Sequence, residues 1–342
     1  MLTKVKIALV GESWGAEEEK ERTAFVGWAG DMLNRLLDEA DIRRQDCLVT
    51  NVFQLRPHNN DILSLTGPKE EALLGYPALD KSKYIRAEFA PQLHRLASEL
   101  LEADPNVIVT LGNTAMWAML GKTKISKLRG VTDTSTHTAT GFKVLPTYHP
   151  AAIIRQYSLR PITIIDLIKA KRESAFPEIR RPKREIWIEP TIEDLYEFDR
   201  RYLQSCTLLA EDIETAGQHI TCVGFGPTPT VALVIPFFGG RRPDRNYWPD
   251  HATERKAWEF IADVNARPGI RKLFQNGLYD IAFLWRANRI RVINAGEDTM
   301  LLHHALQPES LKSLGFMGSI YTDEGPWKSE RTDQVGTIKA ED

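Results

Sequence analysis

The fold expected for the start of the chain follows from residues 4–40, which read KVKIALVGESWGAEEEKERTAFVGWAGDMLNRLLDEA. A short apolar run ends in a glycine, and a long polar loop follows it. From Gly30 onward, apolar side chains recur at helical spacing, at Met32, Leu33, Leu36, Leu37 and Ala40. An apolar strand followed by an amphipathic helix is the repeating unit of α/β proteins.

The same alternation continues to about residue 170. Further apolar runs, CLVTNVFQL, NVIVTLG and FKVLPTY, are separated by polar loops and helical segments. Near-continuous apolar strands that alternate with helices predict a parallel sheet covered on both faces.

The stretch KAKRESAFPEIRRPKREIWIEPT is dense in Lys, Arg and Pro and has no periodicity. We interpret it as a solvated linker, or as a strap that contacts DNA phosphates. The expected division is a first domain over 1–168, a basic linker over 169–190 and a second domain over 191–342. In the second domain strands come first and helices later, which predicts a mixed sheet flanked by helices.

Composition agrees with two globular domains. The chain has 342 residues, 42% of them apolar and 26% charged, with a net charge of −2. No stretch approaches the roughly 20 apolar residues of a membrane span, and no signal peptide is visible, so we expect a soluble cytoplasmic protein without membrane partners. The three cysteines, Cys47, Cys206 and Cys222, support neither a disulfide framework nor a cysteine metal site.

The second domain carries three acids at the end of a predicted strand, in LLAEDIETAG (208–217). Side chains two apart share a face of a strand, so Asp212 and Glu214 should point together and Glu211 away from them. Two neighbouring carboxylates need a cation between them or raised pKa values. In LFQNGLYDIAFLWR (273–286), Asp280 falls in the first turn of a predicted helix just after a strand.

D-x-E followed by N-x-x-x-D resembles the first two motifs of the DEDD-type 3′–5′ exonuclease domain of family-A DNA polymerases. EDTMLLHHALQPESLKSLGFMGSIYTDEGPWK extends the resemblance, chiefly to phage members. It implies an RNase H-like fold and two Mg²⁺ or Mn²⁺ ions on Asp212, Glu214 and Asp280.

The family's last motif, Y-x-x-x-D, is not matched. Ile338 and Asp342 have its spacing without the tyrosine, and Asp298 is a substitute or simply a helix cap. The exonuclease is therefore expected to be weak or to need a partner. From the chain length, we expect that partner to be a phage family-A polymerase encoded separately.

In the first domain, three loops that follow strands should converge at the carboxyl edge of the sheet. They are GESWGAEEEKERTAFVGWAG, TNVFQLRP and LPTYHPAAIIR. In this order they resemble the uracil-DNA glycosylase superfamily, especially family 4, whose pattern runs GEAPG, PFVGRAG, TNVVKCRP and HPA. The resemblance implies an α/β/α fold, a DNA substrate and removal of uracil without strand cleavage.

The resemblance also assigns roles to individual residues. Phe25 would stack on the flipped uracil, and the Asn51 amide would bind its O4 and N3–H. His149, as a neutral donor, would stabilise negative charge on O2, and Glu12 or Glu17 would orient water or offset positive charge on the sugar. Arg155 would bind a phosphate.

Several positions depart from the family 4 pattern. Leu55 and Glu88 stand where two of four iron–sulfur ligands belong, so we expect no cluster. Trp14 replaces a proline, and Ser13 stands where related families carry a catalytic acid. These changes leave two alternatives: an exonuclease with a non-catalytic uracil-DNA-binding module, or a non-catalytic replisome scaffold. The intact acidic set argues against the scaffold, because unpaired buried carboxylates are costly.

Overall fold

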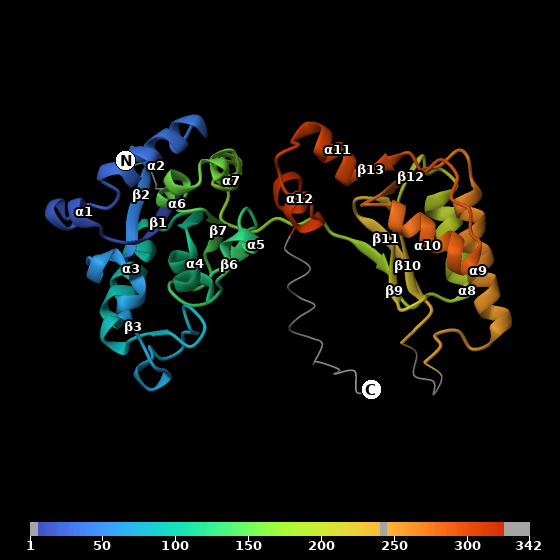
Figure 1. The fold of residues 1–342 in the computed structure, drawn as a ribbon, viewed down its shortest axis with the longest axis horizontal. Coiled ribbons are helices and arrows are strands. Elements are labelled where there is room, and N and C mark those ends of the chain that lie inside the picture. Colours follow the sequence, from blue (N-terminus) through green and yellow to red (C-terminus); the bar gives the residue numbers. More distant parts are fainter. Residues whose placement is uncertain (1–5, 240–244, 325–342) are drawn as a thin grey trace. The chain divides into compact units, whose positions relative to one another are not determined.

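The computed structural model describes residues 6–239 and 245–324, which form two compact units (Figure 1). Of the described residues, 6–181 and 315–324 form the first unit, and 182–239 and 245–314 form the second. The second unit is thus inserted into the chain of the first. This division differs from the expected one, in which the two domains follow each other with boundaries at 168 and 191.

A five-stranded sheet forms the centre of the first unit, with strand order β2-β1-β5-β7-β6. β1 (Ile7–Ser13), β2 (Cys47–Phe53), β5 (Val107–Leu111) and β7 (Lys143–Thr147) are parallel, which confirms the predicted parallel sheet. The short edge strand β6 (Asp133–Thr134) runs antiparallel to β7.

Helices cover both faces of this sheet because the strand side chains are apolar on both sides. On one face, Leu9 and Val109 share a core with α2 (Gly27–Glu39), α6 (Pro150–Arg155) and α7 (Arg160–Glu173). On the other, Val10 and Ile108 share a core with α3 (Ala90–Ala103) and α4 (Asn113–Leu120). The unit is therefore an α/β/α sandwich. Its shorter elements are α1 (Ala16–Glu21), α5 (Ile125–Leu128), β3 (Thr66–Gly67) and β4 (Tyr84–Ile85).

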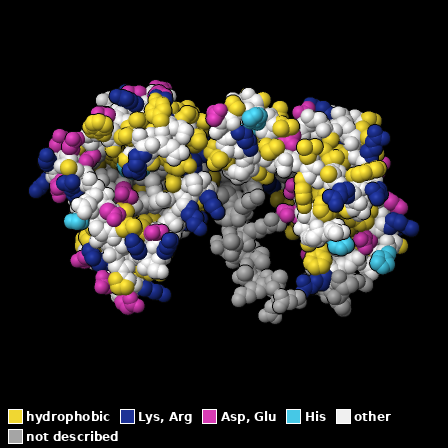
Figure 2. All heavy atoms as spheres, viewed as in Figure 1, with side chains coloured by type: hydrophobic (Ala, Val, Ile, Leu, Met, Phe, Trp, Pro, Cys, Tyr) yellow, Lys and Arg dark blue, Asp and Glu magenta, His cyan; other side chains and the backbone are white. Residues whose placement is uncertain are grey.

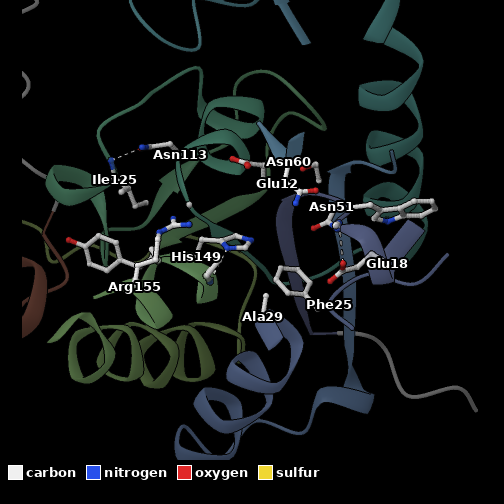
Figure 3. Close-up of a pocket in the computed structure, with 17 residues that line it drawn as sticks. Glu12, Glu18, Phe25, Ala29, Asn51, Asn60, Asn113, Ile125, His149 and Arg155 are labelled. Carbon is white, nitrogen blue, oxygen red and sulfur yellow. Dashed lines mark hydrogen bonds between the residues drawn. The ribbon is translucent and has the colours of Figure 1, made fainter. Parts of the chain in front are cut away.

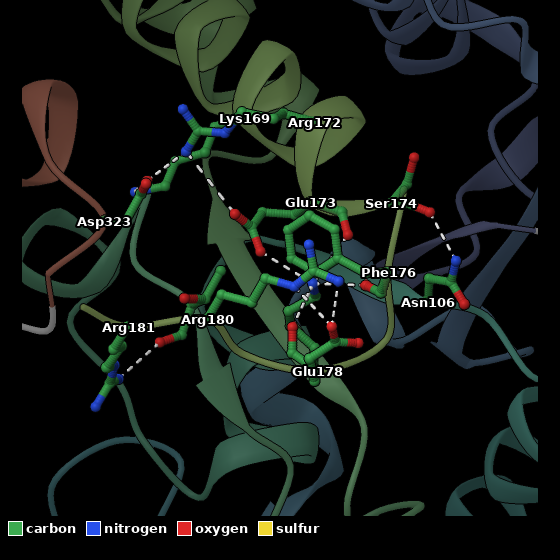
Figure 4. Close-up of polar contacts among 12 residues, drawn as sticks. Asn106, Lys169, Arg172, Glu173, Ser174, Phe176, Glu178, Arg180, Arg181 and Asp323 are labelled. Atoms are coloured by element: carbon green, nitrogen blue, oxygen red, sulfur yellow. Dashed lines mark hydrogen bonds and ion pairs between the residues drawn. The ribbon is translucent and has the colours of Figure 1, made fainter. Parts of the chain in front are cut away.

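Residues 169–181, expected to belong to a solvated linker, are anchored on the first unit. The buried Lys143 ammonium group donates to the backbone carbonyls of Glu173, Phe176 and Glu178 at 2.9, 2.7 and 3.0 Å. The Arg180 guanidinium group lies 3.8 Å from the centre of the Phe176 ring (Figure 4). The linker expectation is wrong for this stretch, because a buried ammonium group requires these carbonyls as partners.

The second unit has a mixed sheet, as predicted; its six strands lie in the order β13-β12-β9-β10-β11-β8. Strands β9 to β11 are antiparallel neighbours, whereas β12 is parallel to β9, β13 to β12 and β8 to β11. The strands are β8 (Glu185–Trp187), β9 (Leu208–Ala216), β10 (His219–Thr228), β11 (Val231–Pro236), β12 (Arg271–Phe274) and β13 (Glu297–Asp298). The helices that follow 182 are α8 (Ile192–Phe198), α9 (His251–Ala266), α10 (Leu278–Asn288), α11 (Thr299–Leu306) and α12 (Leu314–Tyr321), the last of which passes into the first unit.

Charged side chains of both signs are interspersed over the surface shown in Figure 2, as the small net charge leads one to expect. Among the residues that the structure describes, no helix is long and apolar enough to cross a membrane.

Candidate functional site

A pocket of about 430 Å³ opens at the carboxyl ends of β1, β2 and β7 in the first unit (Figure 3). The three predicted loops do converge here. The end of β1 and the loop after it contribute residues 12–15, and Phe25 lies just before α2. Asn51 comes from β2, His149 from the loop after β7 and Arg155 from the end of α6.

Phe25 and Asn51 pack over Gly11, which pairs with Asn51 across the parallel strands. A Cβ atom on Gly11 would lie 2.1 Å from Asn51 Oδ1 and 2.4 Å from Phe25 Cζ, so only glycine fits. Phe25 has a positive φ of 56°, an uncommon backbone state for a bulky residue. Arg44 holds it there by donating from Nη2 to the carbonyls of Ala24 and Phe25 at 3.0 Å each. Strain of this kind concentrates at functional sites.

The Asn51 side chain is 2% exposed, and among the described residues its Oδ1 has no hydrogen-bond partner. Its backbone carbonyl is fixed separately, by Arg95 Nη2 at 2.6 Å. A buried amide oxygen left without a donor costs about 1–3 kcal/mol. The pocket therefore contains an acceptor that a ligand N–H group can satisfy.

His149 is the N-cap residue of α6, and its Nδ1 accepts a hydrogen bond from the Ala151 backbone N–H at 3.2 Å. Burial, and secondarily the charge of Arg155, lowers the pKa of His149 to about 4. The ring is therefore neutral near pH 7 and carries its proton on Nε2. Its centroid lies 5.5 Å from that of Phe25, and the two rings lie side by side in Figure 3.

The two candidate acids differ in position. Glu12 lines the pocket, and its Oε2 accepts from the Thr114 hydroxyl at 2.5 Å. Burial raises the pKa of Glu12, while Thr114 and Arg155 act in the opposite direction. Glu17 is exposed on α1 and does not line the pocket; its neighbour Glu18 does, with a carboxylate that accepts from the Gly15 N–H at 3.1 Å. The structure thus places only the first of the two alternatives in the pocket.

Sequence reasoning missed Thr114, Tyr148 and Glu18. Tyr148 lines the pocket directly before His149 in a motif already singled out, so adjacency was an available signal. Thr114 follows the strand that ends at Leu111, and its role depends on a contact across 102 positions of sequence. No local pattern indicates such a contact.

The acids of the second unit lie on β9, an inner strand of its sheet, and on the neighbouring helix α10. Asp212 and Glu214 are exposed on β9, and Glu211 on the opposite face is buried and accepts from Asn265 Nδ2 at 3.0 Å. Asp280 Oδ1, from α10, accepts from the backbone N–H of Ile213 at 3.2 Å. Burial, helped by the charges of Asp212 and Asp298, raises the pKa of Asp280 to about 6.

Asp298 acts as a helix cap, the second of its two expected roles. Its carboxylate accepts from the backbone N–H groups of Asn276, Gly277, Met300 and Leu301 at 2.8–3.4 Å. Ile338 and Asp342 lie outside the described residues. Within the described part of the chain, no group of three His, Cys, Asp or Glu side chains is close enough to hold a metal ion.

The iron–sulfur positions do not fit a thiolate-bound cluster. Leu55 packs against the apolar core, and Glu88 forms an ion pair with Arg86 at 2.8 Å. Cys47 is the single cysteine of the sequence between residues 1 and 181, and burial raises the pKa of its thiol to about 11. Removal of uracil as proposed for the first unit involves no cluster.

The profile of the uracil DNA glycosylase superfamily matches residues 2–176, about half of the chain, and the chain belongs to this superfamily. It is 36% identical over 170 residues to the type-4 uracil-DNA glycosylase of Thermotoga maritima, covering 48% of this chain and 76% of that protein. The type-4 uracil-DNA glycosylase of Saccharolobus solfataricus is 31% identical over 177 residues, covering 49% and 71%.

Two solved nuclease-related structures are more distantly similar. The Aedes aegypti Nibbler EXO domain gives a TM-score of 0.34 at 12% identity, covering 47% of this chain and 81% of that one. Brucella melitensis NrnC gives 0.28 at 17% identity, covering 42% and 62%. Such scores do not establish a common fold, so the assignment of the second unit depends on its own residues.

Proposed function

We propose that the first unit is a uracil-DNA glycosylase that hydrolyses the N-glycosidic bond of deoxyuridine in DNA and leaves the strand intact. The observation that carries this proposal is the buried, unpartnered Asn51 Oδ1 beside Phe25. Uracil N3–H can donate to that oxygen while O4 accepts from the amide nitrogen. Cytosine presents the reverse pattern, so the same amide discriminates against it.

His149 and Phe25 act on the base itself. The target nucleotide must leave the base stack to reach the pocket, and Phe25 offers a ring face on which the flipped base stacks. As the glycosidic bond breaks, negative charge develops on uracil O2. The neutral His149 donates Nε2–H to that oxygen. Because the ring is already held in place by the Ala151 N–H, it does not have to reorient as the charge develops.

Glu12 and Arg155 act on the sugar and the backbone. The Glu12 carboxylate, fixed by Thr114, orients the attacking water or offsets positive charge on the sugar. Arg155 lines the same pocket and binds a phosphate of the flipped nucleotide. Lys20, the lysine of the loop motifs, is exposed on α1 and does not line the pocket, so no covalent amine intermediate is expected and abasic DNA is the product.

We further propose that the second unit is a metal-dependent 3′–5′ exonuclease. The supporting observation is that Asp280 Oδ1 binds the N–H of Ile213, the residue between Asp212 and Glu214. Carboxylates are oxygen donors of the kind that Mg²⁺ and Mn²⁺ prefer, and the pKa of Asp280 is raised by burial and, less strongly, by the charges of Asp212 and Asp298. Bound cations would supply positive charge to the phosphodiester during its cleavage.

One oligonucleotide tests both proposals. A 5′-labelled strand with a central uracil is incubated in EDTA or in Mn²⁺, heated in alkali and resolved on a gel, beside a matched thymine strand. We expect cleavage at the uracil in both buffers and a 3′-to-5′ ladder in Mn²⁺ alone. A ladder without the uracil product would reduce the first unit to a uracil-DNA-binding module. The absence of both products would support the scaffold alternative.

A phage family-A polymerase as partner stays a prediction. A pull-down with purified family-A polymerase, followed by the Mn²⁺ assay on the complex, tests it. Failure to bind, or binding without any gain in exonuclease rate, would reject the partner.

A further inference from the structure

Residues 315–323, which follow the second unit in sequence, belong to the first unit and are called here the C-terminal clasp. Phe316, Met317 and Ser319 of the clasp are buried. Lys169 of α7 donates to the Thr322 carbonyl at 2.9 Å, and both Lys169 and Arg172 pair with Asp323 (Figure 4). The clasp is therefore held by specific polar contacts as well as by apolar burial.

The clasp completes a buried ion pair. Arg129 and Asp166 have side chains that are 1% and 0% exposed, and Arg129 Nε donates to Asp166 Oδ2 at 2.8 Å. Arg129 Nη1 donates instead to the Ser319 hydroxyl at 2.9 Å, and the Phe316 ring centre lies 5.7 Å from the guanidinium carbon. A buried guanidinium group needs all of its donors satisfied, so without the clasp this pair would open to water.

The same ion pair touches the base of the loop that carries His149. The hydroxyl of Thr147, the last residue of β7, donates to Asp166 Oδ2 at 2.7 Å, two positions before the histidine. Gly130, next to Arg129, donates its N–H to the Pro146 carbonyl at 2.8 Å. A Cβ atom on Gly130 would lie 2.6 Å from Asp166 Oδ1 and 3.2 Å from the Ser319 carbonyl, which shows how closely these three segments approach.

We propose that the C-terminal clasp is a positioning element for the glycosylase pocket, acting through Arg129, Asp166 and Thr147 on the loop that carries Tyr148 and His149. The catalytic donor of the first unit then depends on a segment that the chain supplies only after the whole second unit. This inference rests on the proposed uracil excision for its kinetic consequence, but its structural part can be measured independently.

The test compares the full-length Phe316→Ala/Ser319→Ala variant with the matched control Leu314→Ala, an exposed position at the start of the same helix. Hydrogen exchange is measured by mass spectrometry over 315–323 and 143–155, together with single-turnover uracil release. In the double variant we expect faster exchange in both segments and uracil release slower by roughly tenfold, because small displacements of a catalytic donor are costly. KM should stay within about twofold, and the control should match the wild type in every readout.

Faster exchange in 315–323 with unchanged exchange in 143–155 would overturn the proposal. An unchanged rate of uracil release in a double variant whose residues 315–323 exchange faster would overturn it as well. If the wild type releases no uracil, the proposed function fails, and the exchange in 143–155 still decides whether the clasp acts on the loop. If the double variant does not fold, Ser319→Ala alone removes the acceptor of Arg129 and is judged by the same two segments.

Discussion

The pocket of the first unit and the acidic set of the second differ in how completely the folded chain builds them. Phe25 and Asn51 are buried and pack around Gly11, and His149 is half-buried and neutral near pH 7. Asp212 and Glu214 remain exposed on β9, and Asp280 reaches toward them with a raised pKa. Neutral groups can be packed together in advance, whereas carboxylates repel one another until a cation joins them. The first site is thus a preformed pocket, whereas the acids of the second do not, among the described residues, form a group close enough to hold a metal ion.

Replacing His149 tests the preformed half of this comparison. We expect His149→Ala to slow uracil release by about 10²–10³-fold, since one preorganised donor to a developing anion contributes that much. Single-turnover release from a uracil oligonucleotide measures the effect. His94→Ala, at an exposed histidine on α3, is the matched control and should be silent. A loss of less than about threefold in His149→Ala would show that the pocket does not stabilise charge in this way.

Neutralising the acidic set tests the other half. Asp212→Asn combined with Glu214→Gln should reduce Mn²⁺-dependent degradation by about a hundredfold or more, because the cation loses two of its ligands. Uracil release should not change. Glu259→Gln, at an exposed position on α9, controls for loss of surface charge. Degradation that survives the double substitution would place the nuclease site elsewhere or assign the activity to a contaminant.

Gly11→Ala sharpens the comparison by crowding the preformed pocket. The added methyl group must displace Asn51 Oδ1 and Phe25, so we expect a loss of about 1–3 kcal/mol in the free energy of unfolding, and slower uracil release. Urea denaturation and the release assay measure the two effects. Gly269→Ala in the second unit should not change stability, because the added Cβ atom would lie more than 4 Å from the atoms of any residue other than its chain neighbours. Equal stability of the two variants would mean that the close packing over Gly11 is not real.

His149 and Asp280 should contribute to stability in opposite directions as the pH falls. The lowered pKa of His149 means that the unfolded chain takes up its proton first as pH falls below 6.5, so on acidification from pH 7 to 5 this side chain alone lowers the free energy of unfolding by about 1–2 kcal/mol. Asp280, with a raised pKa of about 6, is protonated first in the folded state, so the same change stabilises the second unit by about 1 kcal/mol. Hydrogen exchange measured separately for each unit gives its stability at pH 7 and pH 5. His149→Gln should remove the contribution of His149, and Asp280→Asn should remove that of Asp280. A pH response that stays the same after either substitution would contradict the environment of the residue replaced.

Sequence patterns predicted the features that depend on near neighbours. The apolar run before Gly11 became a buried parallel strand, and the alternation around Asp212 placed Glu211 on the opposite, buried face. They did not show which of Glu12 and Glu17 lines the pocket, because both lie in the segment before α2. Only the folded chain brings Glu12 to Thr114. They placed a linker at 169–190, although Lys143 anchors the chain at Glu173 and Phe176, because a Lys- and Arg-rich composition does not reveal which carbonyl groups the chain presents to a buried lysine.

The sequence by itself determined the chemistry available to each unit, since strand and helix periodicity fix which side chains share a face. The loops after the strands, together with the family resemblances, indicated an amide, a phenyl ring and an imidazole in the first unit and three carboxylates in the second. Tertiary structure alone decided that the second unit is inserted into the first and that Ser319 satisfies Arg129 across 190 positions. A contact of that range arises from packing and the burial of charge, and no local spacing encodes it.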